Sequence, residues 1–175
     1  MTRFMIQSDD PHLFSPKLIS RHVQAQLSDG YTLRPLRRDD FSKGFIQVLS
    51  QLSITGDISE EQFLARFDLM KRQGTFFVIC IEAEGAIVAC ATLIVEFKFL
   101  HACGQIGHIE DVVVSDTQRG KRLGARLVEQ LTHMAQQLDC YKTILNCSEH
   151  NVAFYEKCGM KRTDVQMTRY FNRQE

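Results

Sequence analysis

Apolar and polar positions in the middle of the chain form a strand pattern that leads directly into a helix pattern. Ile109 to Val114 (IEDVVV) is β-branched apart from Glu110 and Asp111, which predicts a strand covered on both faces. The polar residues 115–118 break this pattern. From Leu123 to about Leu138 the apolar residues recur at helical spacing, so we expect an amphipathic helix.

The first turn of this helix is rich in glycine and in basic residues. Gly120 and Gly124 let a ligand approach the backbone, because glycine has no Cβ. Backbone N–H groups at a helix start have no intrahelical partner and attract anions. Positive charge is added by Arg119, Lys121, Arg122 and Arg126. This favours a phosphate or pyrophosphate site, although a solvated basic helix start has the same composition. The spacing matches neither the Walker loop nor the dinucleotide fingerprint.

The rest of the chain alternates between short strand and helix patterns. Pro35 cannot donate to a central ladder, so the first strand is expected at the sheet edge. Ser59 and Gln62 form a capping box, and Gly85 lies in the turn of a predicted antiparallel hairpin. We expect strands at 31–36, 75–81, 87–96, 104–114, 141–147 and 165–171, and further helices at 41–52, 59–74 and 151–157. This order predicts an α/β domain with a mixed sheet and helices on its faces.

Composition narrows the class of protein. A chain of 175 residues with 44% hydrophobic and 24% charged residues fits one globular domain. We expect residues 1–29, with two prolines and no periodicity, to form a partly mobile N-terminal arm before a domain at 30–175. The formal net charge of zero gives no general attraction to nucleic acid or to a membrane, and no apolar run reaches the ~20 residues of a span.

The spacing of the cysteines indicates the cellular compartment. The six cysteines include no Cys-x-x-Cys pair, and no secretory signal precedes them. We therefore expect free thiols and a cytoplasmic location, with Cys80 and Cys90 filling the core.

A buried strand, a glycine-rich helix start, one more strand and a helix opening Asn-x-x-Phe-Tyr together resemble the GNAT acetyltransferase superfamily. The resemblance covers about residues 31–171. Three blocks are similar to its glucosamine-6-phosphate N-acetyltransferase family: 109–112 (IEDV), 140–142 (CYK) and 151–159 (NVAFYEKCG). Residues 98–101 (KFLH) resemble that family's substrate loop, and residues 52–56 (LSITG) resemble its early substrate-contacting turn.

This resemblance implies the GNAT acyl-CoA N-acyltransferase fold, with helices on both faces of a mixed sheet. It implies transfer of an acetyl group from acetyl-CoA to the 2-amino group of glucosamine 6-phosphate in UDP-N-acetylglucosamine synthesis, without a metal. The family is dimeric with shared sites. We therefore expect a homodimer, and the unpaired edge of the strand predicted at 165–171 supports it.

The resemblance also implies the residues of the site. Four residues would take part in catalysis: Glu110, Val112, Asn146 and Tyr155. The cofactor would contact Asp111, Val112, Val113, Val114, Arg119, Gly120, Lys121, Arg122, Leu123, Gly124, Asn151, Phe154 and Tyr155. The sugar phosphate would contact Ser53, Lys98, His101, Glu110, Asp111, Tyr141, Lys142 and Arg169.

The chemistry of the groups themselves makes three of these residues candidates for the roles that the resemblance implies. The Val112 N–H, on a strand that splays open, could donate to the thioester oxygen. Tyr155 has a phenol with a reference pKa of about 10, which stays protonated and can donate to the departing sulfur. Glu110 and Asp111 point to opposite faces of a regular strand, and Glu110 shares a face with Val112, which makes Glu110 the expected base.

Three positions depart from the family pattern. Arg122 stands where the superfamily motif has its middle glycine. Asn146 stands where relatives often carry Asp or Glu, and an amide cannot act as a base. Arg169 lies one residue from the expected position of a C-terminal arginine, which Tyr170 occupies.

Other readings of the same residues remain open. Tyr155 could instead be an ordinary core tyrosine, and Glu110 could be a buried carboxylate that accepts from a backbone donor. Asn151 could be an ordinary helix N-cap. Lys98, His101 and Lys142 also fit solvated surface groups. The protein as a whole fits a GNAT enzyme for another amine or for protein lysine, or a CoA-binding module without turnover.

Overall fold

Five strands form one sheet, in the order β1-β2-β3-β4-β5, in this computed structural model, which describes residues 10–171. The strands are β1 (Tyr31–Pro35), β2 (Phe76–Ala83), β3 (Ala86–Phe97), β4 (Gln105–Val114) and β5 (Cys140–Ile144). Neighbours from β1 to β4 are antiparallel, and β5 is parallel to β4. The mixed sheet, the β2–β3 hairpin and the edge position of β1 are therefore confirmed.

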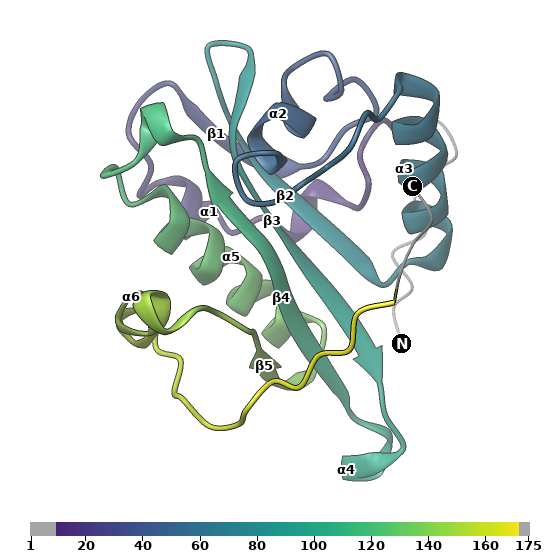
Figure 1. The fold of residues 1–175 in the computed structure, drawn as a ribbon, viewed down its shortest axis with the longest axis vertical. Coiled ribbons are helices and arrows are strands. Elements are labelled where there is room, and N and C mark those ends of the chain that lie inside the picture. The colour runs from purple at the N-terminus through teal and green to yellow at the C-terminus, as the bar shows by residue number, and fades with distance from the viewer. Residues whose placement is uncertain (1–9, 172–175) are drawn as a thin grey trace. The chain divides into compact units, whose positions relative to one another are not determined.

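Helices cover both faces of this sheet (Figure 1). The helices of the described residues are α1 (Arg21–Gln24), α2 (Phe45–Leu49), α3 (Glu60–Gln73), α4 (Leu100–Cys103), α5 (Leu123–Gln137) and, in the C-terminal part, α6 (Val152–Lys157), with 3-10 turns η1 (Pro16–Leu18), η2 (Asp116–Gln118) and η3 (Glu149–Asn151). Helices α1 and α5 pack on one face, and α2 and α3 lie on the other. The capping box of Ser59 and Gln62 is confirmed. The helix expected from residue 41 begins only at Phe45, because Gly44 has a left-handed conformation.

The core lies between α5 and the sheet. Leu127, Leu131 and Met134 of α5 are fully buried. At Gly107 of β4, an added Cβ would lie 2.9 Å from a Leu93 methyl carbon and 3.2 Å from the Cβ of Ala135, so glycine permits this close packing. Cys80 and Cys90 are buried on the opposite face, as expected for core fillers, and burial raises the pKa of both thiols.

From residue 10 onward, the segment expected as an arm packs on the domain. Leu13, Phe14, Leu18 and Val23 are buried. The buried Gln130 side chain of α5 donates to the Leu18 carbonyl at 2.9 Å and accepts from the Ser20 N–H at 2.9 Å. Residues 1–9 lie outside the described residues.

The chain divides into two compact units, residues 1–145 and residues 146–175.

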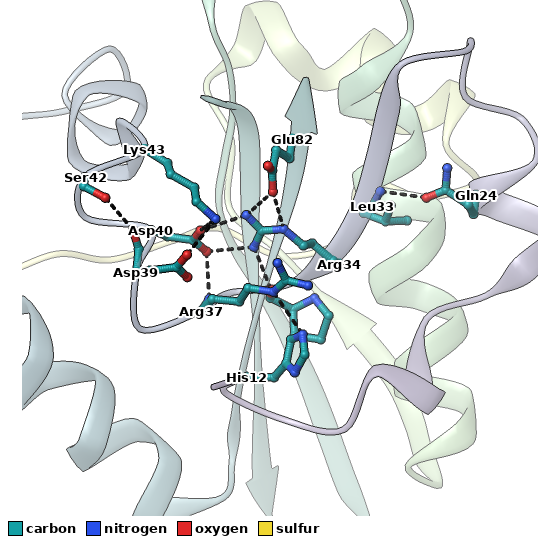
Figure 2. Close-up of polar contacts among 11 residues, drawn as sticks. His12, Gln24, Leu33, Arg34, Arg37, Asp39, Asp40, Ser42, Lys43 and Glu82 are labelled. Carbon is teal, nitrogen blue, oxygen red and sulfur yellow. Dashed lines mark hydrogen bonds and ion pairs between the residues drawn. The ribbon is translucent and has the colours of Figure 1, made fainter. Parts of the chain in front are cut away.

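A buried ion pair ties β1 to the turn before α2 (Figure 2). The Arg34 guanidinium donates to both carboxylate oxygens of Asp40, at 2.8 and 2.7 Å, and to Glu82 at 2.7 Å. Asp40 also accepts from the Arg37 N–H at 2.7 Å. Arg37 donates to His12 at 3.0 Å, which connects the N-terminal segment to the same cluster. Because the Asp40 carboxylate is buried, removal of Arg34 would take away the partner of both its oxygens.

The second unit contains η3 and α6, followed by an extended segment. The strand predicted at 165–171 is wrong, since these residues form no strand in the structure. A strand requires a neighbour for its backbone hydrogen bonds, and the described part of this unit contains no other strand. Its apolar side chains are exposed: Val165 85%, Met167 89%, Tyr170 91% and Phe171 78%.

Candidate active site

The loop between β4 and α5 has the geometry of an anion site. Gly120 has φ +82°, and an added Cβ there would meet nothing within 4 Å, so the backbone conformation rather than space requires glycine. Arg122, the N-cap residue of α5, has φ 61° and ψ 14°, a left-handed conformation, and its side chain makes no capping hydrogen bond. The first N–H groups of this 15-residue helix are therefore not capped by that side chain.

The basic side chains of this loop differ in how they are held. Lys121 donates to the Tyr31 hydroxyl at 2.8 Å and to the Gln118 side-chain oxygen at 2.7 Å. Tyr31 also donates to Gln118 at 2.7 Å, which closes a triangle. Arg126 pairs with Glu129 one turn along α5, whereas Arg119 and Arg122 are exposed. The positive charge of Lys121 is thus fixed in place beside the loop.

Strand β4 bulges in the middle of the predicted catalytic stretch. Glu110 pairs with Thr92 and Val113 pairs with Cys90, so Asp111 and Val112 together oppose the single residue Ala91. Asp111 has φ 54°, which lies outside the strand region. A bulge leaves the extra residue out of the hydrogen-bond ladder. The bulge sets Asp111 and Val112 opposite one residue of β3, and the donor role of the Val112 N–H stays a prediction.

The bulge corrects the face assignment made from sequence. Cys90 and Thr92 lie two residues apart on β3 and share a face, so their partners Glu110 and Val113 share it too. The expectation that Glu110 shares a face with Val112 is wrong, because the inserted residue interrupts the alternation. The expectation that the three valines are covered on both faces is also wrong: Val113 is buried, while Val112 and Val114 are only half-buried.

Both carboxyl groups of the adjacent pair Glu110 and Asp111 have raised pKa values. Partial burial raises the pKa of Glu110, the charge of Asp111 raises it further, and His108 acts in the opposite direction. Desolvation raises the pKa of Asp111 as well, although its side chain is exposed. A carboxyl group with a raised pKa is a better proton acceptor when ionised, which suits Glu110 to base catalysis.

Four of the predicted sugar contacts lie in the β3–β4 turn or on β5: Lys98, His101, Tyr141 and Lys142. Lys98, just after β3, forms an ion pair with Glu96. His101 of α4 stacks on Tyr141 of β5, with ring centroids 4.2 Å apart, and the Lys142 ammonium lies 6.0 Å from the same ring. The structure thus brings His101, Tyr141 and Lys142 together.

The α4 turn that carries His101 is strained. His101, Ala102 and Cys103 all have φ between 52° and 62°, a left-handed conformation that side chains disfavour. Ser53 lies apart from these residues, exposed in the loop after α2.

The second unit carries the remaining predicted residues. β5 ends at Ile144, so Asn146 lies beyond the strand and is exposed. Asn151 stands at the N-cap position of α6 but makes no side-chain capping bond, so the N-cap reading is not supported by a hydrogen bond. The Phe154 ring is 4.9 Å from that of Tyr155, in an edge-to-face arrangement, and Arg169 lies over Phe171 at 5.7 Å.

Comparison with known proteins gives the family. The model of the acetyltransferase (GNAT) family matches residues 33–160. The chain belongs to the GNAT family. It is 44% identical over 149 residues to a glucosamine 6-phosphate N-acetyltransferase of Arabidopsis thaliana, covering 83% of this chain and all of that protein. It is 46% identical over 147 residues to glucosamine 6-phosphate N-acetyltransferase 1 of Dictyostelium discoideum, covering 82% and 93%.

A solved structure agrees with this GNAT assignment. The crystal structure of glucosamine-6-phosphate N-acetyltransferase from Arabidopsis thaliana superposes with a TM-score of 0.80, covering 81% of this chain and 99% of that one. The predicted GNAT fold is therefore confirmed. None of the helices in the described range is long and apolar enough to cross a membrane.

The residues at the start of α5 fit the cofactor of GNAT enzymes, acetyl-CoA. The uncapped helix start and the open space at Gly120 suit a pyrophosphate, and Lys121 supplies a fixed charge beside them. Leu123 is buried, so only its backbone can contact a ligand.

Sequence reasoning missed four residues of this region: Tyr31, Glu96, His108 and Gln118. His108 lies two residues before Glu110, and Glu96 two before Lys98, so strand alternation places each of them beside a predicted site residue. The partnership of Tyr31 with Lys121 carries no sequence signal, because 90 residues separate them.

Proposed function

We propose that this GNAT protein transfers the acetyl group of acetyl-CoA to the 2-amino group of glucosamine 6-phosphate, giving N-acetylglucosamine 6-phosphate and CoA. The observation that carries the proposal is the 44% identity to the Arabidopsis enzyme over all of its length. The bulge at Asp111 and the uncapped start of α5 supply the local geometry that the reaction needs. In the cytoplasm this product would serve UDP-N-acetylglucosamine synthesis.

The cofactor would bind along β4 and the start of α5. The first N–H groups of α5, with Gly120, Arg119 and Lys121, would hold the pyrophosphate. The Val112 N–H, beside the bulge, would donate to the thioester oxygen as negative charge develops there. Asn151 and Phe154 would also contact the cofactor.

Acetyl transfer moves two protons. The amine nitrogen attacks the thioester carbon, a C–N bond forms and the C–S bond breaks. Glu110 takes one proton from the nitrogen, and the Tyr155 phenol gives one to the departing sulfur. Asn146 orients the amine through its side-chain oxygen, since an amide accepts hydrogen bonds without taking a proton.

The sugar phosphate would be bound by positive groups near the hairpin end. Lys98, His101 and Lys142 supply charge or N–H donors, and Tyr141 supports two of them through its ring. Ser53 would contact the sugar from the loop after α2. Arg169 would contact it from the C-terminal segment.

A thiol-release assay tests the proposed function. Acetyl-CoA is supplied with glucosamine 6-phosphate, glucosamine, other amines or a lysine peptide, and free CoA is measured. We expect the highest kcat/KM with glucosamine 6-phosphate and a large loss with unphosphorylated glucosamine. Preference for a peptide or another amine would assign a different GNAT reaction, and CoA binding without turnover would assign a binding module.

We also propose that two copies form a homodimer through residues 165–171. Four apolar side chains of this extended segment are at least 78% exposed, and its backbone can pair with a strand of a second copy. Light scattering should give twice the chain mass, and Met167→Ser with Phe171→Ser should reduce it to one chain. Leu69→Ser on α3 is the control. A monomeric, fully active wild type would contradict this proposal.

A further inference from the structure

A row of polar side chains follows the face of β3 and β4 that carries Glu110. On β4, His108 pairs with Ile94 and Glu110 pairs with Thr92. Thr92, Ile94 and Glu96 are spaced by two residues along β3 and therefore share a face. Glu96, His108 and Glu110 thus project from the same side of the sheet.

Glu96 holds His108 in one tautomer. The His108 Nε2 lies 2.9 Å from one carboxylate oxygen of Glu96, and the other oxygen pairs with the Lys98 ammonium. Hydrogen bonds from Lys98 and His108 lower the pKa of the Glu96 carboxyl, which therefore stays ionised and only accepts. A neutral His108 must then donate from Nε2, which leaves the lone pair on Nδ1 to accept a proton.

His108 lies two residues before Glu110 on the same face of β4. Two residues along a strand correspond to about 7 Å between Cα atoms, a separation that one water molecule can bridge between side chains on the same face. When His108 is protonated, its charge lowers the pKa of Glu110, in opposition to burial and to Asp111, which raise it. His108 is also 30% exposed, so it can release a proton to solvent.

The presence of Asn146, where relatives often carry Asp or Glu, gives His108 and Glu110 a role in moving the proton. Asn146 cannot take a proton, so it cannot be the acceptor for the Glu110 proton. We propose that His108, positioned by Glu96, accepts through one water the proton that Glu110 takes from the amine, and so restores the Glu110 carboxylate in each turnover. This proposal rests on the proposed function, in which Glu110 is the base. The imidazolium formed is paired with the Glu96 carboxylate and returns its proton to bulk water.

The charges around His108 favour this transfer. Glu96 lies on β3, Lys98 just beyond it, and Glu110 and Asp111 on β4. On β5, Ile144 pairs with His108, and the nearest charge is Lys142, which pairs with Ile106. Helix α2, which packs against β3 and β4, carries no ionisable residue. Glu96 is thus the group in direct contact with the ring.

The test compares His108→Asn, Glu96→Gln and Glu110→Gln in steady-state kinetics from pH 5.5 to 9, a range chosen on the order of the imidazole transition. We expect His108→Asn to lower kcat by roughly 10- to 100-fold and to change the acid limb of the pH profile, with the KM for acetyl-CoA unchanged. Added imidazole should restore part of the rate. Glu96→Gln should lower kcat less and remove the same limb. His22→Asn, on the exposed part of α1, is the matched control.

The combined variant separates this inference from the proposed function. If the proton moves from Glu110 to His108, Glu110→Gln with His108→Asn should be no slower than Glu110→Gln alone. A loss with Glu110→Gln but a wild-type rate and pH profile with His108→Asn would overturn the relay and keep Glu110 as base. If His108→Asn does not fold, a wild-type pH profile in Glu96→Gln overturns the relay. Wild-type inactivity with glucosamine 6-phosphate would instead refute the proposed function.

Discussion

Arg122→Gly should stabilise the protein, because Arg122 holds a backbone conformation that glycine adopts without strain. Its φ of 61° and ψ of 14° lie in the left-handed region. A non-glycine residue there costs about 1–2 kcal/mol. Glycine in turn loses about 0.5–1 kcal/mol more backbone entropy on folding. The net gain in the free energy of unfolding is then about 0.5–1 kcal/mol.

Thermal melts can measure a gain of this size. For a chain of this length, about 1 kcal/mol moves Tm by roughly 2–4 °C. Arg122→Ala is the matched control, since it removes the same charge but keeps the Cβ and therefore the strain. Gly120→Ala, at φ +82°, should show the opposite sign and lower Tm.

The comparison between the glycine and alanine variants decides the outcome. If Arg122→Gly and Arg122→Ala have the same Tm, the left-handed conformation is not the source of strain and the reasoning fails. The side-chain charge is tested separately by the KM for acetyl-CoA in Arg122→Ala. An increase there would show that the arginine contributes binding at the motif position where GNAT relatives carry glycine.

Three further predictions concern the site. Burial and Asp111 raise the pKa of Glu110, so ionisation of Glu110 costs stability as pH rises above the usual glutamate pKa of about 4.3. Glu110→Gln should therefore raise Tm at pH 8 and lose that gain near pH 4. A difference in Tm that does not depend on pH would contradict the raised pKa. Lys121→Ala should raise the KM for acetyl-CoA about 3- to 10-fold, and Tyr31→Phe less, with kcat unchanged. A rise confined to the sugar KM would refute this assignment. Tyr155→Phe should lower kcat roughly 10²-fold or more in rapid-mixing assays of thiol release, and an unchanged rate would exclude it as the acid.

Local patterns in the sequence were sufficient for much of the fold. The stripe from Leu123 to Leu138 identified α5, and Ser59 with Gln62 identified the start of α3. Gly85 identified the β2–β3 turn. These features depend on residues within one or two turns of each other, and the physical causes, periodic burial and capping, are visible in the order of side chains.

The position of the candidate site along the chain could be predicted from the sequence, but its geometry could not. Glu110, Val112 and the Arg119–Gly124 loop were found from their neighbours in the chain. The prediction that Glu110 shares a face with Val112 was wrong, because the bulge at Asp111 arises only from the pairing of β4 with β3. An insertion of one residue reverses every later side chain, and no local pattern marks it.

The sequence by itself determined the five strands of the sheet, the longer helices, the family and the candidate chemical groups of the site. Only the tertiary structure decided that Arg122 is left-handed, that Lys121 rests on Tyr31, that Glu96 holds His108, and that residues 165–171 form no strand. Each of these depends on which distant backbone or side chain supplies a partner. Partners that lie far apart in the chain are chosen by packing of the whole domain, so their contacts are decided only when it folds.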